Sequence, residues 1–193
     1  MKFSKIRLSK SGTLECTYKN EDGDIVQFVG ANIVHKDLRE ALQGLIPHLA
    51  LITEQREAYK ATLGKLREQR ITDNEDNVYK RLSVSGIAVS ADQKKVIITG
   101  SRILTTAGVV SVCTPLMDLE AEDDYKYTND LSLDVEAVTY EAKAYIEEKK
   151  WGVKQGELEF KDINPFDAIK AGEVPEAPAE GKTKKRGRKS KAA

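Results

Sequence analysis

One pattern constrains the fold of this chain more than any other, because it occurs twice: three short alternating runs followed by a helical run. Residues 3–8, 13–19 and 24–30 alternate between apolar and polar side chains, which is typical of half-buried strands. Turn-forming residues separate these runs, most clearly at residues 20–23. The spacing therefore predicts a three-stranded antiparallel meander.

A helical pattern follows the meander. Apolar residues recur at helical spacing from about Asp37 to Arg70, which predicts one long helical segment. Pro47 lies inside this pattern. Because proline lacks an N–H and clashes with the preceding turn, we expect it to kink the helix or to start a new one.

The same order of patterns returns in the second half of the chain. Residues 79–89, 95–104 and 108–114 read as strands, and a bulge is expected at Gly86, where the alternation shifts. A second amphipathic helix is predicted from about Ser132 to Lys150. The chain thus repeats a β-β-β-α order.

Two such units predict an α+β fold, with an antiparallel sheet and helices packed on one of its faces. We expect a single domain over residues 1–170, with a pseudo-repeat of residues 1–77 and 78–152. Residues 171–193 nearly lack large apolar side chains, so they cannot bury enough surface to offset the entropy of ordering. We therefore predict a disordered C-terminal tail.

The net charge of zero conceals an asymmetry between the tail and the rest of the chain. Residues 182–193 carry seven of the 31 bases and no acid. The other 181 residues hold the remaining 24 bases against all 31 acids, which gives them a net charge of −7. An acidic body with a basic tail indicates contact with nucleic acid or with another anionic surface.

The tail bases that we expect to bind nucleic acid form one short run: Lys184, Lys185, Arg186, Arg188 and Lys189. This run resembles an AT-hook, whose Arg-Gly-Arg core enters the minor groove, although Lys189 stands where a proline normally follows. A generic polybasic arm would bind phosphates with little sequence preference and a steep salt dependence. A nuclear localisation signal in a eukaryote and a solubilising tail are the two alternatives.

The first strand carries further bases. Strict alternation would place Lys5 and Arg7 on the face of Phe3, opposite Ile6 and Leu8. Bases beside an aromatic ring on a sheet face are typical of proteins that hold a single-stranded backbone and stack its bases. The alternative is an edge strand whose lysines prevent pairing with other chains.

No pattern indicates a reaction, so we expect no catalytic residue, no cofactor and no metal site. The carboxylates of residues 118–136 match no calcium-loop spacing. Cys16 and Cys113 lie in apolar strand-like runs and are expected to be buried, reduced thiols. No stretch is long and apolar enough for a membrane span or a secretory signal, which predicts a cytoplasmic protein, or a nuclear one in a eukaryote.

The size, the meander order and the charged tail together give a general resemblance to small accessory proteins of bacteriophage DNA replication and recombination, such as single-strand-binding or annealing factors. The resemblance implies a non-enzymatic DNA-binding protein that self-associates. It implies a binding site made of Lys5, Arg7, Arg81, Arg102 and the tail bases. The alternative is a protein-interaction module, such as a phage assembly or host-inhibiting factor, with an incidental tail. A metal-dependent hydrolase using the acidic segment is a third hypothesis.

Overall fold

The first three strands form the predicted antiparallel meander. β1 is Lys2–Leu8, β2 is Thr13–Lys19 and β3 is Ile25–Ile33. Gly12 and Gly23, in the two connecting turns, have positive φ angles that glycine adopts without the steric cost of a Cβ. The computed structural model describes residues 1–72, 77–121 and 125–152, all within one compact unit, Met1–Lys154.

The second meander joins the first through its own first strand, because β4 pairs antiparallel with β1. The order across the sheet is β3-β2-β1-β4-β5-β6, and the short β7 pairs with β5. Gly86 lies at a register shift between β4 and β5, so the bulge predicted there is confirmed. The strands of this half are β4 (Leu82–Val89), β5 (Lys95–Leu104), β6 (Gly108–Cys113) and β7 (Met117–Asp118).

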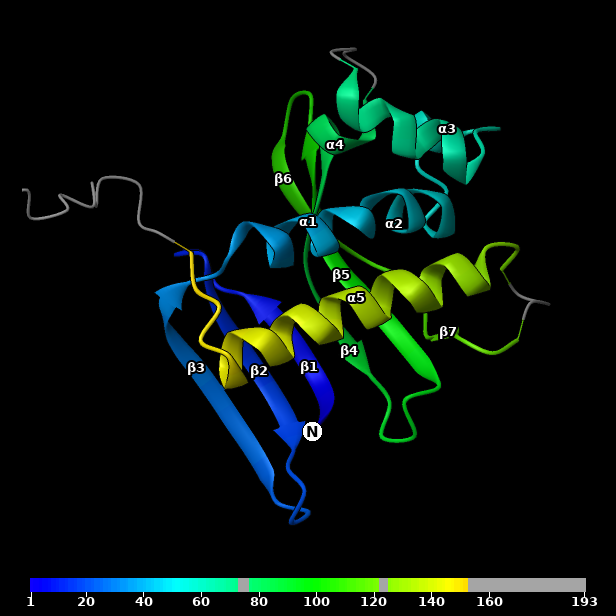
Figure 1. Cartoon of the computed structure of the whole chain (residues 1–193). Coiled ribbons are helices and arrows are strands. Elements are labelled where there is room, and N and C mark those ends of the chain that lie inside the picture. The colour runs from blue at the N-terminus through cyan, green and yellow to red at the C-terminus, as the bar shows by residue number, and fades with distance from the viewer. Residues whose placement is uncertain (73–76, 122–124, 153–193) are drawn as a thin grey trace, which may run out of the picture. The chain divides into compact units, whose positions relative to one another are not determined.

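Helices cover one face of the sheet, as Figure 1 shows for α1 (Lys36–Gly44), α2 (Ile46–Ile52) and α5 (Thr128–Glu147). Their apolar side chains meet those of the central strands in a continuous core. The predicted α+β fold with an antiparallel sheet is therefore confirmed. The large side chains below 2% exposure in this core include Phe3, Ile6, Leu14, Leu38, Leu49, Ile98 and Leu131.

The prediction of one helical segment up to Arg70 is wrong in its length. Pro47 lies in the first turn of α2, which confirms that it starts a new helix. Beyond α2 the chain turns at Glu54 and Lys60, both with positive φ. Short helices follow: η1 (Arg56–Ala58), α3 (Leu63–Glu68), η2 (Gln69–Ile71) and α4 (Val78–Arg81).

A second small core explains why the apolar spacing did not reveal these turns. Leu66 of α3 and Val78 of α4 pack with Ile46 and Leu82, so apolar residues stay buried although the chain changes direction. The strand predicted from residue 79 therefore begins only at Leu82.

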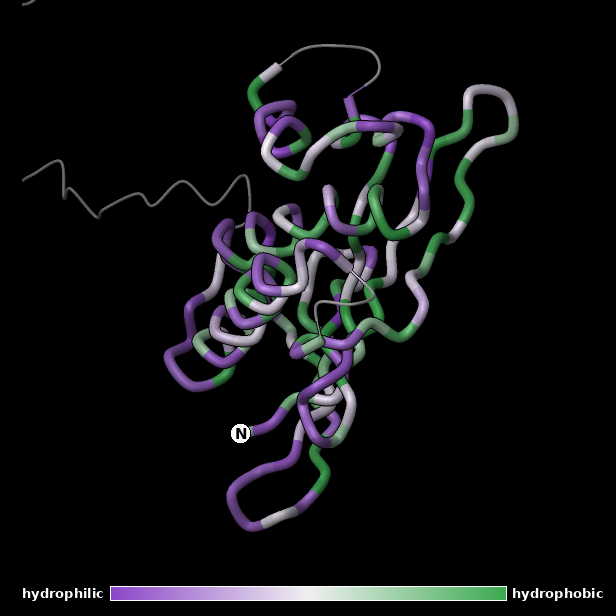
Figure 2. Tube along the Cα trace, turned by 90° about the vertical axis from the view of Figure 1, so that its right-hand side faces the viewer, coloured by the Kyte–Doolittle hydropathy of each residue, from purple (hydrophilic) through white to green (hydrophobic). Residues whose placement is uncertain are grey.

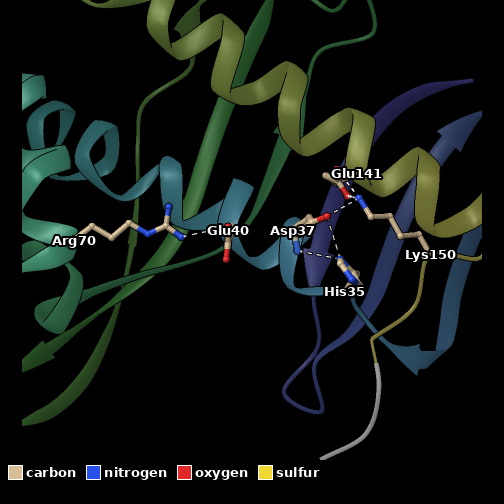
Figure 3. Close-up of polar contacts among 6 residues, drawn as sticks. All are labelled: His35, Asp37, Glu40, Arg70, Glu141 and Lys150. Atoms are coloured by element: carbon tan, nitrogen blue, oxygen red, sulfur yellow. Dashed lines mark hydrogen bonds and ion pairs between the residues drawn. The ribbon is translucent and has the colours of Figure 1, made fainter.

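The end of α5 is tied to α1 by an ion-pair cluster (Figure 3). Lys150 Nζ lies 2.7 Å from an Asp37 carboxylate oxygen and 2.8 Å from one of Glu141. The hydrogen bond from Lys150 holds the pKa of Asp37 below its ordinary value. α5 begins four residues before the predicted start at Ser132 and ends at Glu147, three residues before the predicted end at Lys150, and Lys149 beyond it has a positive φ.

The prediction of two buried thiols holds for Cys16 and is wrong for Cys113. Cys16 lies in the core, whereas Cys113 is exposed. The reason is topological: β6 is the last strand in the sheet order, and Cys113, the cross-strand partner of Thr99, lies on the face without helices.

Candidate nucleic-acid interface

A β-bulge in β1 decides which side chains share the uncovered face of the sheet. Lys2 is paired with Lys19 and Phe3 with Tyr18, but the register shifts before Lys5, which is paired with Thr17. Phe3 and Ile6 consequently both lie in the core, at 1% and 0% exposure. The expected placement of Phe3 beside Lys5 is therefore wrong.

The same bulge aligns the bases of β1. Cross-strand partners in an antiparallel sheet lie on the same face, so the pairs with β2 place Lys2, Lys5 and Arg7 together on the face without helices. Lys10 continues the row in the turn after β1. We call Lys2, Lys5, Arg7 and Lys10 the basic stripe.

A groove lies beside the basic stripe, over the centre of the uncovered face. It has a volume of about 640 Å³ and is lined by β1, β4, β5 and β6. Lys5, Arg7 and Lys10 supply its charge, and its lining contains no acid. Hydroxyl groups lie along it on Ser9, Ser85, Thr99, Ser101 and Ser111.

Gly86, at the centre of the groove, allows β4 to lie close to β1. A Cβ at Gly86 would lie 2.8 Å from the Cα of Arg7 and would also clash with the carbonyl oxygen of Ile6. Any side chain here would therefore push the two strands apart at the position of Arg7.

The bases of the stripe remain available to a ligand. Within the described part of the chain, none of them forms an ion pair with a carboxylate. Glu15 is the acid nearest in register, as the cross-strand partner of Arg7. Lysine, arginine, serine and threonine side chains are the groups that contact phosphates in protein–DNA complexes. The groove lacks an aromatic lining residue, so it offers phosphate contacts rather than base stacking.

The structure places Arg81 and Arg102 in a cluster of their own, away from Lys5 and Arg7. Arg102 forms a bidentate pair with Glu57, with both N···O distances 2.8 Å, and also contacts Gln55. Burial, the largest single influence, would raise the pKa of Glu57, but the hydrogen bond and charge of Arg102, a backbone hydrogen bond and the charge of Arg81 together lower that pKa. Arg81 lines a small pocket of about 140 Å³ with this pair.

The bidentate pair leaves little of Arg102 for a phosphate. The Glu57 side chain is only 8% exposed, so separating the pair would leave a largely buried carboxylate without its ion-pair partner. Lys184, Lys185, Arg186, Arg188 and Lys189 lie outside the described residues, as does the whole segment 153–193.

The described chain ends beside one end of the basic stripe. The carbonyl of Gly12, two residues after Lys10, accepts a hydrogen bond from the Val34 N–H at 2.9 Å. Val34 in turn forms a β-bridge with Trp151. Trp151 and Gly152, the last described residues, therefore lie close to the turn that contains Lys10.

A buried polar network that the sequence did not reveal lies on the helical side of the sheet. His48 of α2 is fully buried, with Nδ1 2.9 Å from the Tyr125 hydroxyl and Nε2 3.1 Å from Asp134 of α5. Arg67 of α3 binds both Asp134 and Asp130. Since these partners are 77 and 86 residues from His48, no local motif could have indicated them.

The centre of this network is closed to solvent. His48 has no exposed surface and so cannot touch a substrate. Its two ring nitrogens are both occupied, and burial raises the pKa of Tyr125 above its ordinary value. The network joins α2, α3 and α5.

Comparison with known proteins identifies no relative: no family model, no curated protein and no solved structure matches this chain. Among the described residues, no three His, Cys, Asp or Glu side chains gather in a way that could hold a metal ion. None of the described helices is long and apolar enough to cross a membrane.

Proposed function

We propose that this protein is a non-enzymatic DNA-associated protein that binds or anneals single strands. The observation that carries the proposal is the basic stripe, which lies on the uncovered sheet face beside a groove without acids. The stripe would hold phosphates, and the tail bases would add non-specific affinity through the release of counterions. A role in phage or bacterial replication or recombination remains a prediction.

The acidic charge of the rest of the body is compatible with this proposal. Phosphates are attracted to the basic stripe and repelled by the acidic surface elsewhere. A DNA strand would therefore approach only the uncovered face of the sheet.

Fluorescence anisotropy of labelled single- and double-stranded oligonucleotides, over a range of salt concentrations, tests the proposal. Three full-length variants are needed. One carries Lys5→Gln and Arg7→Gln, one replaces the five tail bases by Gln, and a control carries Lys36→Gln and Lys65→Gln. The control removes the same charge from exposed positions on α1 and α3.

We expect the stripe variant to bind single strands more weakly and with a shallower salt dependence. The slope of log K against log salt should fall by about 1.4, since each phosphate contact to a single strand contributes roughly 0.7. The control should leave the slope unchanged. Equal effects of the stripe variant and the control would contradict the site, and absence of binding by the full chain would contradict the function.

One observation favours the alternative of a protein-interaction module. Ile103, Val109 and Leu116 are each at least 50% exposed in one uncharged part of the chain. If the full chain binds no nucleic acid, this apolar surface becomes the functional site.

A further inference from the structure

The longest uncharged stretch of this highly charged chain is exposed over much of its length. Charged residues make up 32% of the sequence, yet none occurs in residues 103–117. The exposed fractions in this stretch are 50% for Ile103, 65% for Val109 and 39% for Val110. In Figure 2 the hairpin between β5 and β6 projects at the upper right and is drawn largely in the hydrophobic colour.

β6 also presents an open edge for hydrogen bonding. Backbone groups of successive residues in a strand point alternately toward one neighbour and the other. The N–H of Thr114 binds the carbonyl of Ile98 in β5, so Val109, Ser111 and Cys113 direct their N–H and C=O groups away from β5. Within the described residues no strand pairs with this edge.

Monomeric proteins normally protect such an edge with a charge, a proline or a covering element. β6 consists of Gly, Val, Ser and Cys, so it carries neither a charge nor a proline, and no described strand pairs with its outer edge. An exposed, uncharged and apolar edge strand is a template for pairing with another strand.

We propose that β6 pairs antiparallel with β6 of a second copy of this chain, about a two-fold axis at Ser111. This register sets Ser111 opposite Ser111 and Val109 opposite Cys113 on one face of the sheet. On the opposite face it sets Val110 opposite Val112. The outward-directed backbone N–H and C=O groups of Val109, Ser111 and Cys113 then pair with those of the same residues in the other copy. An isologous contact of this kind closes as a dimer.

The self-complementarity of β6 favours a second copy as the occupant. A strand without charges meets its own copy without repulsion, and every pair of facing side chains in this register is apolar or hydroxyl-bearing. Pairing of β6 with β3 would instead be heterologous and would build a closed ring or an open filament rather than a dimer.

The other edge of the sheet is partly covered. Trp151 bridges Val34 just beyond β3, and the Gly152 N–H binds the carbonyl of Ile33. The two edges therefore differ, and only β6 is open along its whole length in the described chain.

Dimerisation through β6 would join two sheets into one. Ser111 lines the groove beside the basic stripe, so the grooves of both copies would adjoin across the axis. This consequence rests on the proposed function, whereas the dimer itself does not.

Sedimentation equilibrium of the full chain without nucleic acid tests the dimer. We expect the wild type to dimerise, and Ser111→Lys and Ser111→Glu each to weaken dimerisation about tenfold or more, because like charges would face each other across the axis. An equimolar mixture of the two variants should restore a heterodimer. Gln27→Lys, on the exposed edge of β3, is the matched control and should dimerise like the wild type.

A monomeric wild type, or a dimer that Gln27→Lys disrupts and Ser111→Lys does not, overturns the proposal. Cross-linking checks the register independently. Under mild oxidation Val109→Cys should form an intermolecular disulfide with Cys113, since paired strands bring Cα atoms to about 5.5 Å. Val110→Cys points to the other face and should not. Efficient cross-linking of Val110→Cys alone would contradict the register.

Discussion

Single residues hold the uncovered face of the sheet in its observed form, and Gly86 shows this most directly. A Cβ on Gly86 would overlap the backbone of β1, whereas a Cβ on Gly64, in α3, would meet nothing within 4 Å. The two glycines thus serve different needs: Gly86 permits a close approach of strands, and Gly64 merely weakens a helix.

Alanine at these two positions should have opposite effects on stability. We expect Gly86→Ala to lower the free energy of unfolding by about 1–3 kcal/mol, the usual cost of overpacking. Gly64→Ala should raise it by about 0.5–1 kcal/mol, because alanine loses less backbone entropy in a helix. Urea denaturation followed by circular dichroism measures both. A neutral Gly86→Ala would mean that β1 and β4 can separate without cost.

At the scale of elements, the helices are joined to one another by polar groups as well as by the apolar core. Asp134 of α5 contacts His48 of α2 at 3.1 Å and Arg67 of α3 at 3.0 Å. Asp130, one turn earlier, forms its ion pair with Arg67 alone among the described residues and has a side chain that is 42% exposed. Asp134, whose side chain is 25% exposed and which also binds the buried His48, should therefore matter more than Asp130.

We expect Asp134→Ala to lower the free energy of unfolding by about 1–3 kcal/mol, because it leaves a nitrogen of the fully buried His48 without a partner. Asp130→Ala, the matched control, should cost less than about 1 kcal/mol, as exposed ion pairs do. Thermal or chemical denaturation of both variants gives the comparison. Equal losses would show that the His48 contact adds nothing beyond the ion pair with Arg67.

At the scale of the whole molecule, the two proposed surfaces lie on different parts of one sheet. The basic stripe runs along the central strand β1, and the pairing edge is the outermost strand β6. Phosphate binding and self-association should therefore respond to different substitutions.

The variant with Lys5→Gln and Arg7→Gln should show the same dimer dissociation constant as the wild type in sedimentation equilibrium, since neither residue belongs to β6. Its loss of affinity for single strands should persist at protein concentrations where the dimer dominates. A shift of the dimerisation constant would show instead that β1 and β6 are coupled through the sheet.

Much of the fold follows from local patterns, and the site follows only in part. β2 and β5 have the predicted bounds, since alternation depends only on neighbouring residues. The position of Phe3 was predicted wrongly because a bulge reverses the alternation without leaving a mark in the sequence. The partner of Arg102, in turn, is 45 residues away along the chain, and local spacing carries no information on such a contact.

The sequence by itself determined the two meanders, the α+β class and the concentration of bases in residues 182–193. These features depend on side-chain periodicity and composition, which are local. Only the tertiary structure decided that β1 pairs with β4, that Lys2 joins Lys5 and Arg7 on one face, and that β6 has an open edge. Those outcomes depend on which strands meet and in what register, and the whole core, rather than any one segment, fixes that choice.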